Sequence, residues 1–183
     1  MLIGERTHQA LATGYPVGKR FKSAPVVRVG DANDVQLGHH HRADGRWRIY
    51  AFADAATLGA PSALSDWAEW LSSSEESPLR AYTPEGADID HVFDVKVIAQ
   101  QPYTEVDLGF VPGAVMPRTG PFGLIDYDLG DAAIPDEYIF ALRGISRDGA
   151  VVVVRPDQYV ANVLPLTATA ELAAFFAGIL LPR

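Results

Sequence analysis

Cysteine is absent from all 183 residues of the chain. This excludes disulfide bonds, thiolate metal ligands and cysteine redox chemistry. It also fits a cytoplasmic protein, because that compartment keeps thiols reduced and seldom uses disulfides. Long apolar runs are lacking too, since the longest, residues 172–181, is far too short to span a bilayer. We therefore predict a cytoplasmic protein that has no membrane partner.

Motifs for nucleotide binding and hydrolysis are also missing. No G-x-G-x-x-G occurs, so the chain offers no Rossmann cradle for a dinucleotide phosphate. Ser23, Ser62 and Ser146 lack the G-x-S-x-G setting of a hydrolase nucleophile. Gly30-Asp31-Ala32 resembles a short flavoprotein motif, but we interpret it as a turn because no long apolar strand precedes it and no helix follows it. We accordingly expect no catalytic residue and no bound cofactor or metal in this chain.

The charge is negative overall but unevenly distributed. The net charge of −8 argues against a partner that is a nucleic acid. Residues 1–28 carry five bases and one acid, or +4, which leaves ten bases and 22 acids, or −12, for the rest. The basic segment could dock on an acidic body by long-range attraction, or it could simply be solvated.

Histidine and carboxylate clusters are the remaining candidates for chemistry. We interpret His39–His41 as a polar turn, because consecutive residues point in different directions and metal sites favour spaced ligands. Zinc binding stays the alternative. Two acidic clusters lie in expected loops, and solvated acids explain them more simply than catalysis does, because no nucleophile or metal set accompanies them. Their members are Asp88, Asp90 and His91 in one cluster, and Asp126 and Asp128 in the other.

Hydrophobic periodicity predicts the first half of the fold. Residues 26–29 and 35–40 favour short strands, and the alternation over Arg46–Ala53 indicates a longer one. Apolar residues then recur at helical spacing from Ser62 to Leu71, with serine available as the cap. His91–Ala99 alternates again and predicts another strand.

The second half centres on a hairpin. An Asp148-Gly149 turn leads into four consecutive valines, a pattern typical of a strand that is buried on both faces. Arg155–Gln158 is rich in turn formers, and a second apolar strand runs from Tyr159 to Leu164. A helix is expected before the hairpin, over Ile134–Leu142. Another is expected after it, with Thr167 or Thr169 as its cap and Glu171 in its first turn.

These elements predict an α/β fold. The order strand, helix, strand, helix, strand, strand, helix is the thioredoxin-like βαβ-α-ββα arrangement, with helices on both faces of the sheet. Residues 1–25, rich in glycine and proline, are expected to form a basic, extended N-terminal arm, and residues 26–183 the domain. The loop over Pro102–Gly123 is unusually long and could serve a stand-alone small-molecule-binding module.

Four sequence blocks resemble the C-terminal region of FAD-dependent aromatic hydroxylases, in particular the group of phenol 2-monooxygenase and 3-hydroxybenzoate 4-monooxygenase. The blocks, in the family's order, are Gly4–Thr7, Gly14–Phe21, Arg42–Phe52 and Val154–Ala161. The resemblance implies a thioredoxin-like domain that has lost its redox cysteines and is associated with dimerisation. It marks Trp47 and the run Arg155, Pro156, Asp157, Gln158 and Tyr159 as family-motif residues, to which we assign a structural role.

The resemblance also implies what lies outside this chain. The family's FAD-binding and substrate regions would precede Met1, so FAD and NADPH are implied only for a full-length relative. Two alternatives follow. The chain is a non-catalytic interaction and homodimerisation domain, with the arm contacting a flavin or substrate domain. Alternatively, it is part of an active FAD/NADPH-dependent aromatic hydroxylase whose catalytic portion lies upstream.

Overall fold

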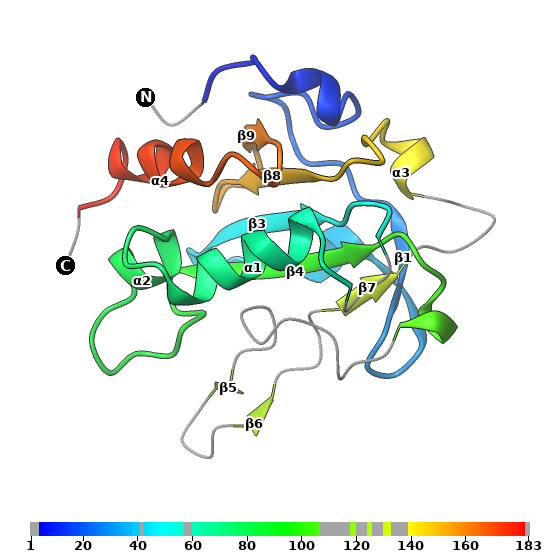
Figure 1. Ribbon diagram of the computed structural model, residues 1–183, viewed down its shortest axis with the longest axis horizontal. Helices are drawn as coiled ribbons and strands as arrows, with labels where there is room; N and C mark the ends of the chain where they lie inside the picture. The colour runs from blue at the N-terminus through cyan, green and yellow to red at the C-terminus, as the bar shows by residue number, and fades with distance from the viewer. Residues whose placement is uncertain are drawn as a thin grey trace.

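The computed structural model describes residues 4–40, 42–56, 60–106, 118–119, 124–125, 130–132 and 139–181. Its centre is a seven-stranded sheet of order β2-β1-β7-β4-β3-β8-β9 (Figure 1). The strands of this sheet are β1 (Pro25–Arg28), β2 (Asn33–Gln36), β3 (Trp47–Phe52), β4 (Phe93–Ala99), β7 (Gly130–Ala132), β8 (Ala150–Val154) and β9 (Val160–Leu164). A separate pair consists of β5 (Arg118–Thr119) and β6 (Leu124–Ile125).

Helices cover both faces of this sheet. The α-helices are α1 (Ala63–Ser73), α2 (Pro78–Tyr82), α3 (Ile139–Leu142) and α4 (Thr169–Ala177). Short 3-10 helices are η1 (Gln9–Leu11), η2 (Leu37–His40) and η3 (Tyr103–Glu105). Strand β3 pairs in parallel with β4 after the α1–α2 crossover, and antiparallel with β8, which forms the predicted hairpin with β9. The predicted βαβ-α-ββα order is therefore confirmed.

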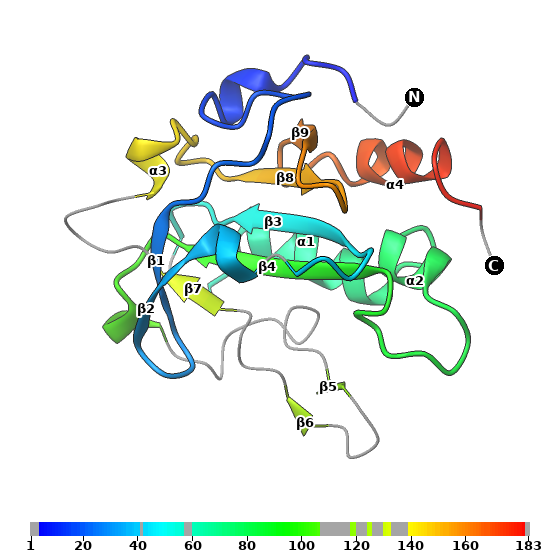
Figure 2. The ribbon, with the colours of Figure 1, turned by 180° about the vertical axis from the view of Figure 1, so that it is seen from behind.

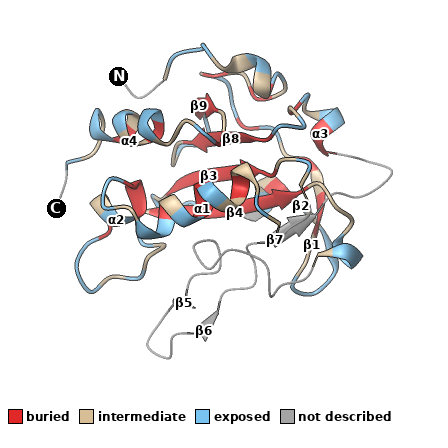
Figure 3. Cartoon of the chain, viewed as in Figure 1, coloured by how far each residue is buried: buried red, intermediate tan, exposed pale blue. Residues whose placement is uncertain are grey.

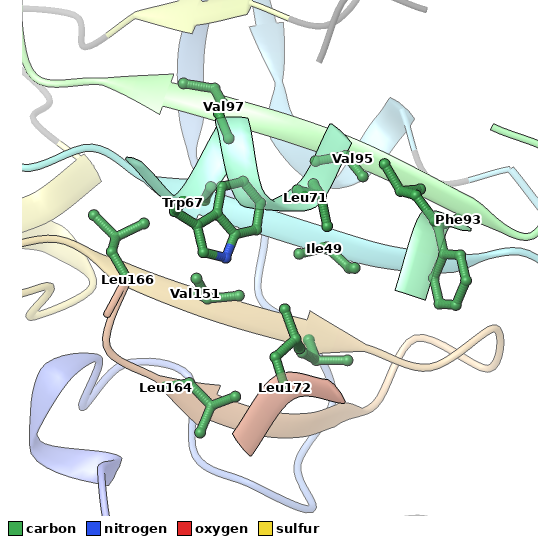
Figure 4. Close-up of a cluster of buried hydrophobic side chains, with 14 of the residues drawn as sticks. Ile49, Trp67, Leu71, Phe93, Val95, Val97, Val151, Leu164, Leu166 and Leu172 are labelled. Carbon is green, nitrogen blue, oxygen red and sulfur yellow. The ribbon is translucent and has the colours of Figure 1, made fainter. Parts of the chain in front are cut away.

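One face of the sheet packs against α1, α2 and α4. Trp67 and Leu71 of α1 point toward Ile49 of β3 and Val151 of β8 (Figure 4). Helix α1 begins as its sequence predicts, because the Ser62 hydroxyl accepts a hydrogen bond from the Ser65 N–H at 3.1 Å. This face forms the larger of two buried apolar clusters.

The other face packs against α3 and the N-terminal segment, which crosses the back of the molecule (Figure 2). Its core combines Phe52 of β3 and Phe140 of α3 with residues of the segment predicted as an arm. The buried residues of that segment are Ala12, Tyr15, Val17, Phe21 and Ala24. These five apolar side chains are thus buried in the chain's own core, while the boundary at residue 25 stays a prediction.

The central strands are buried from end to end, as the red colouring of β3, β4 and β8 shows (Figure 3). In β3 this includes Arg48, whose side chain is inaccessible to solvent. Gly149 takes a left-handed φ of +86° in the turn before β8, as the Asp148-Gly149 pattern predicts.

Some predicted elements are wrong or incomplete. The strand predicted over 35–40 ends at Gln36, because the chain turns into η2 where Gly38 N–H donates to the Ser23 hydroxyl at 2.9 Å. Neither Thr167 nor Thr169 caps α4. Its N-cap is Ala168, which makes no side-chain capping bond. Of the helix predicted over 134–142, residues 134–138 lie outside the described residues, and α3 covers the rest. Strand β7 was not predicted.

Candidate functional site

At one end of the sheet, the loop before α1 and the loop before β8 lie close to the C-terminal end of β4. Here amide and guanidinium groups join these loops. Gln100, just after β4, donates from Nε2 to the carbonyls of Ala53 at 2.8 Å and Arg147 at 2.9 Å. Arg147 donates a hydrogen bond from Nη1 to Gln100 Oε1 at 2.7 Å. Asp54 accepts from Ala63 N–H, at the start of α1, at 2.8 Å. These polar groups bind one another and hold the loops together.

The family-motif run Arg155–Tyr159 forms the turn between β8 and β9. Gln158 N–H donates to the Arg155 carbonyl at 2.9 Å, and Pro156 occupies the second position of that turn. Gln158 has a left-handed φ of +70°. The Arg155 guanidinium bonds the carboxylate of Asp157 through two nitrogens. Its central carbon also lies 5.9 Å from the centroid of the Tyr159 ring.

The same turn anchors the N-terminal segment. Arg20 donates from its guanidinium to Gln158 Oε1 at 2.7 Å, and Phe21 N–H donates to the Gln158 carbonyl at 2.8 Å. Gly18 and Lys19 then exchange backbone bonds with Val160 at 2.8 and 2.9 Å. The motif residues therefore form a turn to which the N-terminal segment binds. The structural role assigned to them stays a prediction.

Trp47, the other motif residue, lies at the start of β3 and is 7% exposed. Its ring meets Phe175 and Phe176 of α4 edge-on, with centroids 6.2 and 5.3 Å away. Such edge-to-face pairs add to the gain from burial alone. Trp47 thus joins the central sheet to the last helix.

A buried ionic cluster joins β3 to β4 and was not predicted from the sequence. Arg48 Nε lies 2.8 Å from Asp94 Oδ2, and Lys96 Nζ lies 3.4 Å from Asp94 Oδ1. All three side chains are nearly inaccessible, and β3–β4 pairing places Arg48 opposite Asp94. Arg48 also bonds both carboxylate oxygens of Asp44 at 2.9 Å. Opposite charges compensate one another here, as buried charges require.

The carboxylates beside this cluster differ in pKa. Burial would raise the pKa of Asp44, but hydrogen bonds from Arg48 and Arg46 outweigh it and hold that pKa well below its usual range. Burial raises the pKa of Asp90, although Arg46 Nη1 lies 2.7 Å away and opposes the shift. Arg48 bonds Asp44 and the Arg42 carbonyl and so holds the loop before β3 against the sheet, while Arg46 bonds Asp90 in the loop before β4. Because the carboxylates of Asp44 and Asp90 are both bonded to arginine, these two residues do not form a free pair of general acid and general base.

Where the structure describes them, the remaining candidate residues, the histidine and carboxylate clusters, do not come together in one site. His39 is exposed beside β2, and the other members of His39–His41 have side chains outside the described residues. Asp90 bonds Arg46, while His91 is exposed. Asp126 and Asp128 lie outside the described residues. Within the described part of the chain, no group of three or more His, Asp or Glu residues could hold a metal ion. Among the same residues, no helix is long and apolar enough to cross a membrane.

Comparison with known families identifies the domain. The family model for the phenol hydroxylase C-terminal dimerisation domain matches residues 1–183. The chain belongs to this family. Over 181 residues it is 52% identical to 3-hydroxybenzoate 4-monooxygenase of Comamonas testosteroni, covering 96% of the chain and 28% of that protein. Over 179 residues it is 35% identical to the FAD-dependent monooxygenase terD of Aspergillus terreus, covering 93% of the chain and 29% of that protein.

The thioredoxin-like fold is confirmed by solved structures. The thioredoxin domain of a thiol-disulfide oxidoreductase from Bacteroides vulgatus superposes with a TM-score of 0.51 at 10% identity, over 90% of this chain and 97% of the other. ScoI of Arabidopsis thaliana gives 0.51 at 13% identity, over 88% and 96%. At such identities the likeness shows the fold alone. This dimerisation domain spans less than a third of the curated relatives it matches.

Proposed function

We propose that this domain acts as a non-catalytic homodimerisation module. The observation that carries the proposal is the match of the dimerisation family over all of residues 1–183. The internal geometry agrees with it. The side chains of Gln100 and Arg147 bind each other and the loops of the chain itself, and the buried charges of the Arg48 cluster pair with one another.

We further propose that the domain works as part of an FAD/NADPH-dependent aromatic hydroxylase. The relatives that support this carry monooxygenase names and are more than three times as long as the matched region. In this proposal, FAD, NADPH and the aromatic substrate bind to the portion of such an enzyme beyond the matched region, and pairing of two domains joins two catalytic units.

The N-terminal arm is the segment that we propose to contact a flavin or substrate domain. Its apolar residues Tyr15, Val17 and Phe21 are buried in this chain. The exposed side chains nearby are cationic, namely Lys19, Arg20 and Lys22. We propose that the arm contacts another domain through these charges, so that the contact weakens as salt is raised.

Subunit exchange tests the dimerisation proposal. Affinity-tagged and untagged copies are mixed, equilibrated and captured through the tag. From an equimolar mixture we expect about half of the untagged copy to be retained, because random exchange of the subunits of a homodimer places half of the untagged chains in mixed dimers. Retention no greater than that of an unrelated untagged protein would refute dimerisation.

Flavin titration tests the assignment of the cofactor. We expect the purified domain to leave the fluorescence of FAD unchanged and to elute without flavin absorbance on gel filtration. Co-elution of FAD at micromolar affinity would show that the domain itself holds the cofactor and would contradict its non-catalytic assignment.

A further inference from the structure

The two edges of the sheet differ in their hydrogen bonding. At the β9 edge, the N-terminal segment bonds the outward backbone groups: Gly4 N–H donates to Ala161 at 2.7 Å, and Gly18 and Lys19 bond Val160. The Val163 N–H at this edge is bonded by the Asn162 side chain at 2.9 Å. The arm thus closes this edge against strand addition.

The β2 edge is open. Strand β2 pairs with β1 on one side only, and it is the last strand of the sheet. Leu37 N–H donates to the Ala24 carbonyl at 2.9 Å. This bond shows which residues of β2 direct their backbone groups toward β1 and which direct them away. By antiparallel alternation, Val35 faces Val26 through hydrogen bonds, while Asp34 and Gln36 direct their backbone N–H and C=O groups outward. Within the described part of the chain, these outward groups have no hydrogen-bond partner.

A pocket of about 380 Å³ lies at β2 and is lined by Pro25, Asp34, Val35, Gln36 and His39. Residues Asn33, Asp34 and Gln36 are exposed, and Val35 is half-buried. Unpaired edge strands invite another strand, and an exposed edge is usually covered or blunted. The outward positions of β2 carry one charge, that of Asp34, but neither lysine nor proline, which are especially common at blunted edges.

The edge is complementary to a copy of itself. When two β2 strands lie antiparallel about a two-fold axis at Val35, Asp34 faces Gln36 of the second copy. Four backbone hydrogen bonds then form, two for each Asp34–Gln36 pair. The two Asp34 carboxylates lie only on the diagonal, so no like charges face one another directly. A shift of one residue would place Val35, whose backbone groups bond β1, opposite Asp34 or Gln36 of the second copy. The hydrogen bonds between the copies would then be lost, so this register is favoured over the shifted one.

We propose that two copies of this domain dimerise by antiparallel pairing of their β2 strands about a two-fold axis at Val35, giving one sheet continuous across both subunits. The inference rests on the proposed dimerisation function and specifies its interface. A four-residue strand is short, so adjoining exposed surface must add buried area. The 3-10 helix η3 (green) lies beside β1 and β2 in both views, and its Tyr103 is 40% exposed (Figures 1 and 2).

Cysteine cross-linking tests this register, because the chain has no other cysteine. In the proposed dimer the two Val35 residues form a non-hydrogen-bonded pair with Cα atoms about 4.5 Å apart, within the range that a disulfide spans. Val35→Cys should therefore give a covalent dimer under mild oxidation. Asp34→Cys is the matched control, because its copies lie on the diagonal, about 7–8 Å apart.

We expect Val35→Cys to cross-link at least about tenfold faster than Asp34→Cys, reflecting a high effective concentration at the two-fold axis. Random collision would give the reverse order, because Asp34 is the more exposed residue. Faster cross-linking of Asp34→Cys, or slow cross-linking of both variants in a chain that is dimeric, would overturn this interface and leave the dimerisation function intact. A monomeric wild-type chain would overturn the function itself.

A backbone variant provides a second test. Asp34→Pro removes one outward N–H but no bond of the β1–β2 ladder, and proline is tolerated at such edge positions. Asp34→Ala retains the N–H and is the matched control. We expect Asp34→Pro to raise the dimer dissociation constant at least about tenfold, with the circular dichroism spectrum and melting temperature close to those of Asp34→Ala. Equal dissociation constants for two folded variants would place the interface elsewhere.

Discussion

Phe21 stacks on Tyr50 with ring centroids 4.6 Å apart and ring planes 7° from parallel. Tyr15 stacks on the opposite face of Phe21, also at 4.6 Å. The three rings join the N-terminal segment to the central strand β3 across a large separation in sequence. This segment therefore contributes to the stability of the domain as part of its core.

Replacing Phe21 with alanine removes the middle ring of the stack. We expect the free energy of unfolding to fall by about 3–5 kcal/mol, because a large buried side chain is lost and its neighbours cannot fill the space. Lys22→Ala, at an exposed neighbouring position, should change it by less than about 0.5 kcal/mol. Urea denaturation followed by far-ultraviolet circular dichroism measures both. Equal midpoints for the two variants would show that the stack does not hold the segment in place.

Alanine substitution at two glycines with similar backbone conformation distinguishes the cost of backbone strain from the cost of steric overlap. Gly45 and Gly149 have φ of +82° and +86°. A Cβ at Gly45 would meet no atom within 4 Å, whereas one at Gly149 would lie 2.8 Å from the Phe52 carbonyl oxygen. We expect Gly45→Ala to cost about 1–2 kcal/mol through strain alone, and Gly149→Ala to cost about 1–3 kcal/mol more. Thermal melts of both variants test this, and similar losses would argue against close packing at the β8 turn.

Acid stability tests the carboxylates around Arg48. The pKa of Asp44 is lower in the folded chain than in the unfolded one, so its stabilisation is present above about pH 4 and is lost as the pH falls through and below that value. Asp44→Asn should cost about 1–3 kcal/mol at neutral pH and should lose less stability than wild type on acidification. Denaturation midpoints between pH 7 and pH 3 measure this difference.

Asp90 serves as the control, because its pKa is shifted in the direction opposite to that of Asp44. Its pKa is raised by burial, so its protonation favours the folded chain and its contribution grows as the pH falls. Asp90→Asn should therefore lose stability on acidification more steeply than wild type. If Asp44→Asn and Asp90→Asn follow parallel curves, the two carboxylates do not differ in the way the structure indicates.

The order of the central elements could be predicted from local pattern. Four valines flanked by two turns specify a buried hairpin, and the alternation in β3 and β4 marks strands whatever they pair with. Serine followed by apolar residues at helical spacing located the start of α1. The missing cysteines excluded disulfide bonds and cysteine redox chemistry directly. The four sequence blocks indicated the family, and the family model confirmed it.

What could not be predicted depends on pairing between distant segments. The three residues of β7, Gly130–Ala132, carry no strand signature and become a strand only between β4 and β1. The Arg48–Asp94 pair requires the register of β3 against β4, which no single segment specifies. Likewise, the open β2 edge is visible only once the strand order is known.

The molar mass of the wild-type chain in solution tests the central claim most directly. Sedimentation equilibrium over a dilution series, from high to low micromolar concentration, should fit a reversible dimer with a limiting mass twice the 19.8 kDa of one chain. A single species of 19.8 kDa at every concentration would contradict the assignment of this chain as a dimerisation domain.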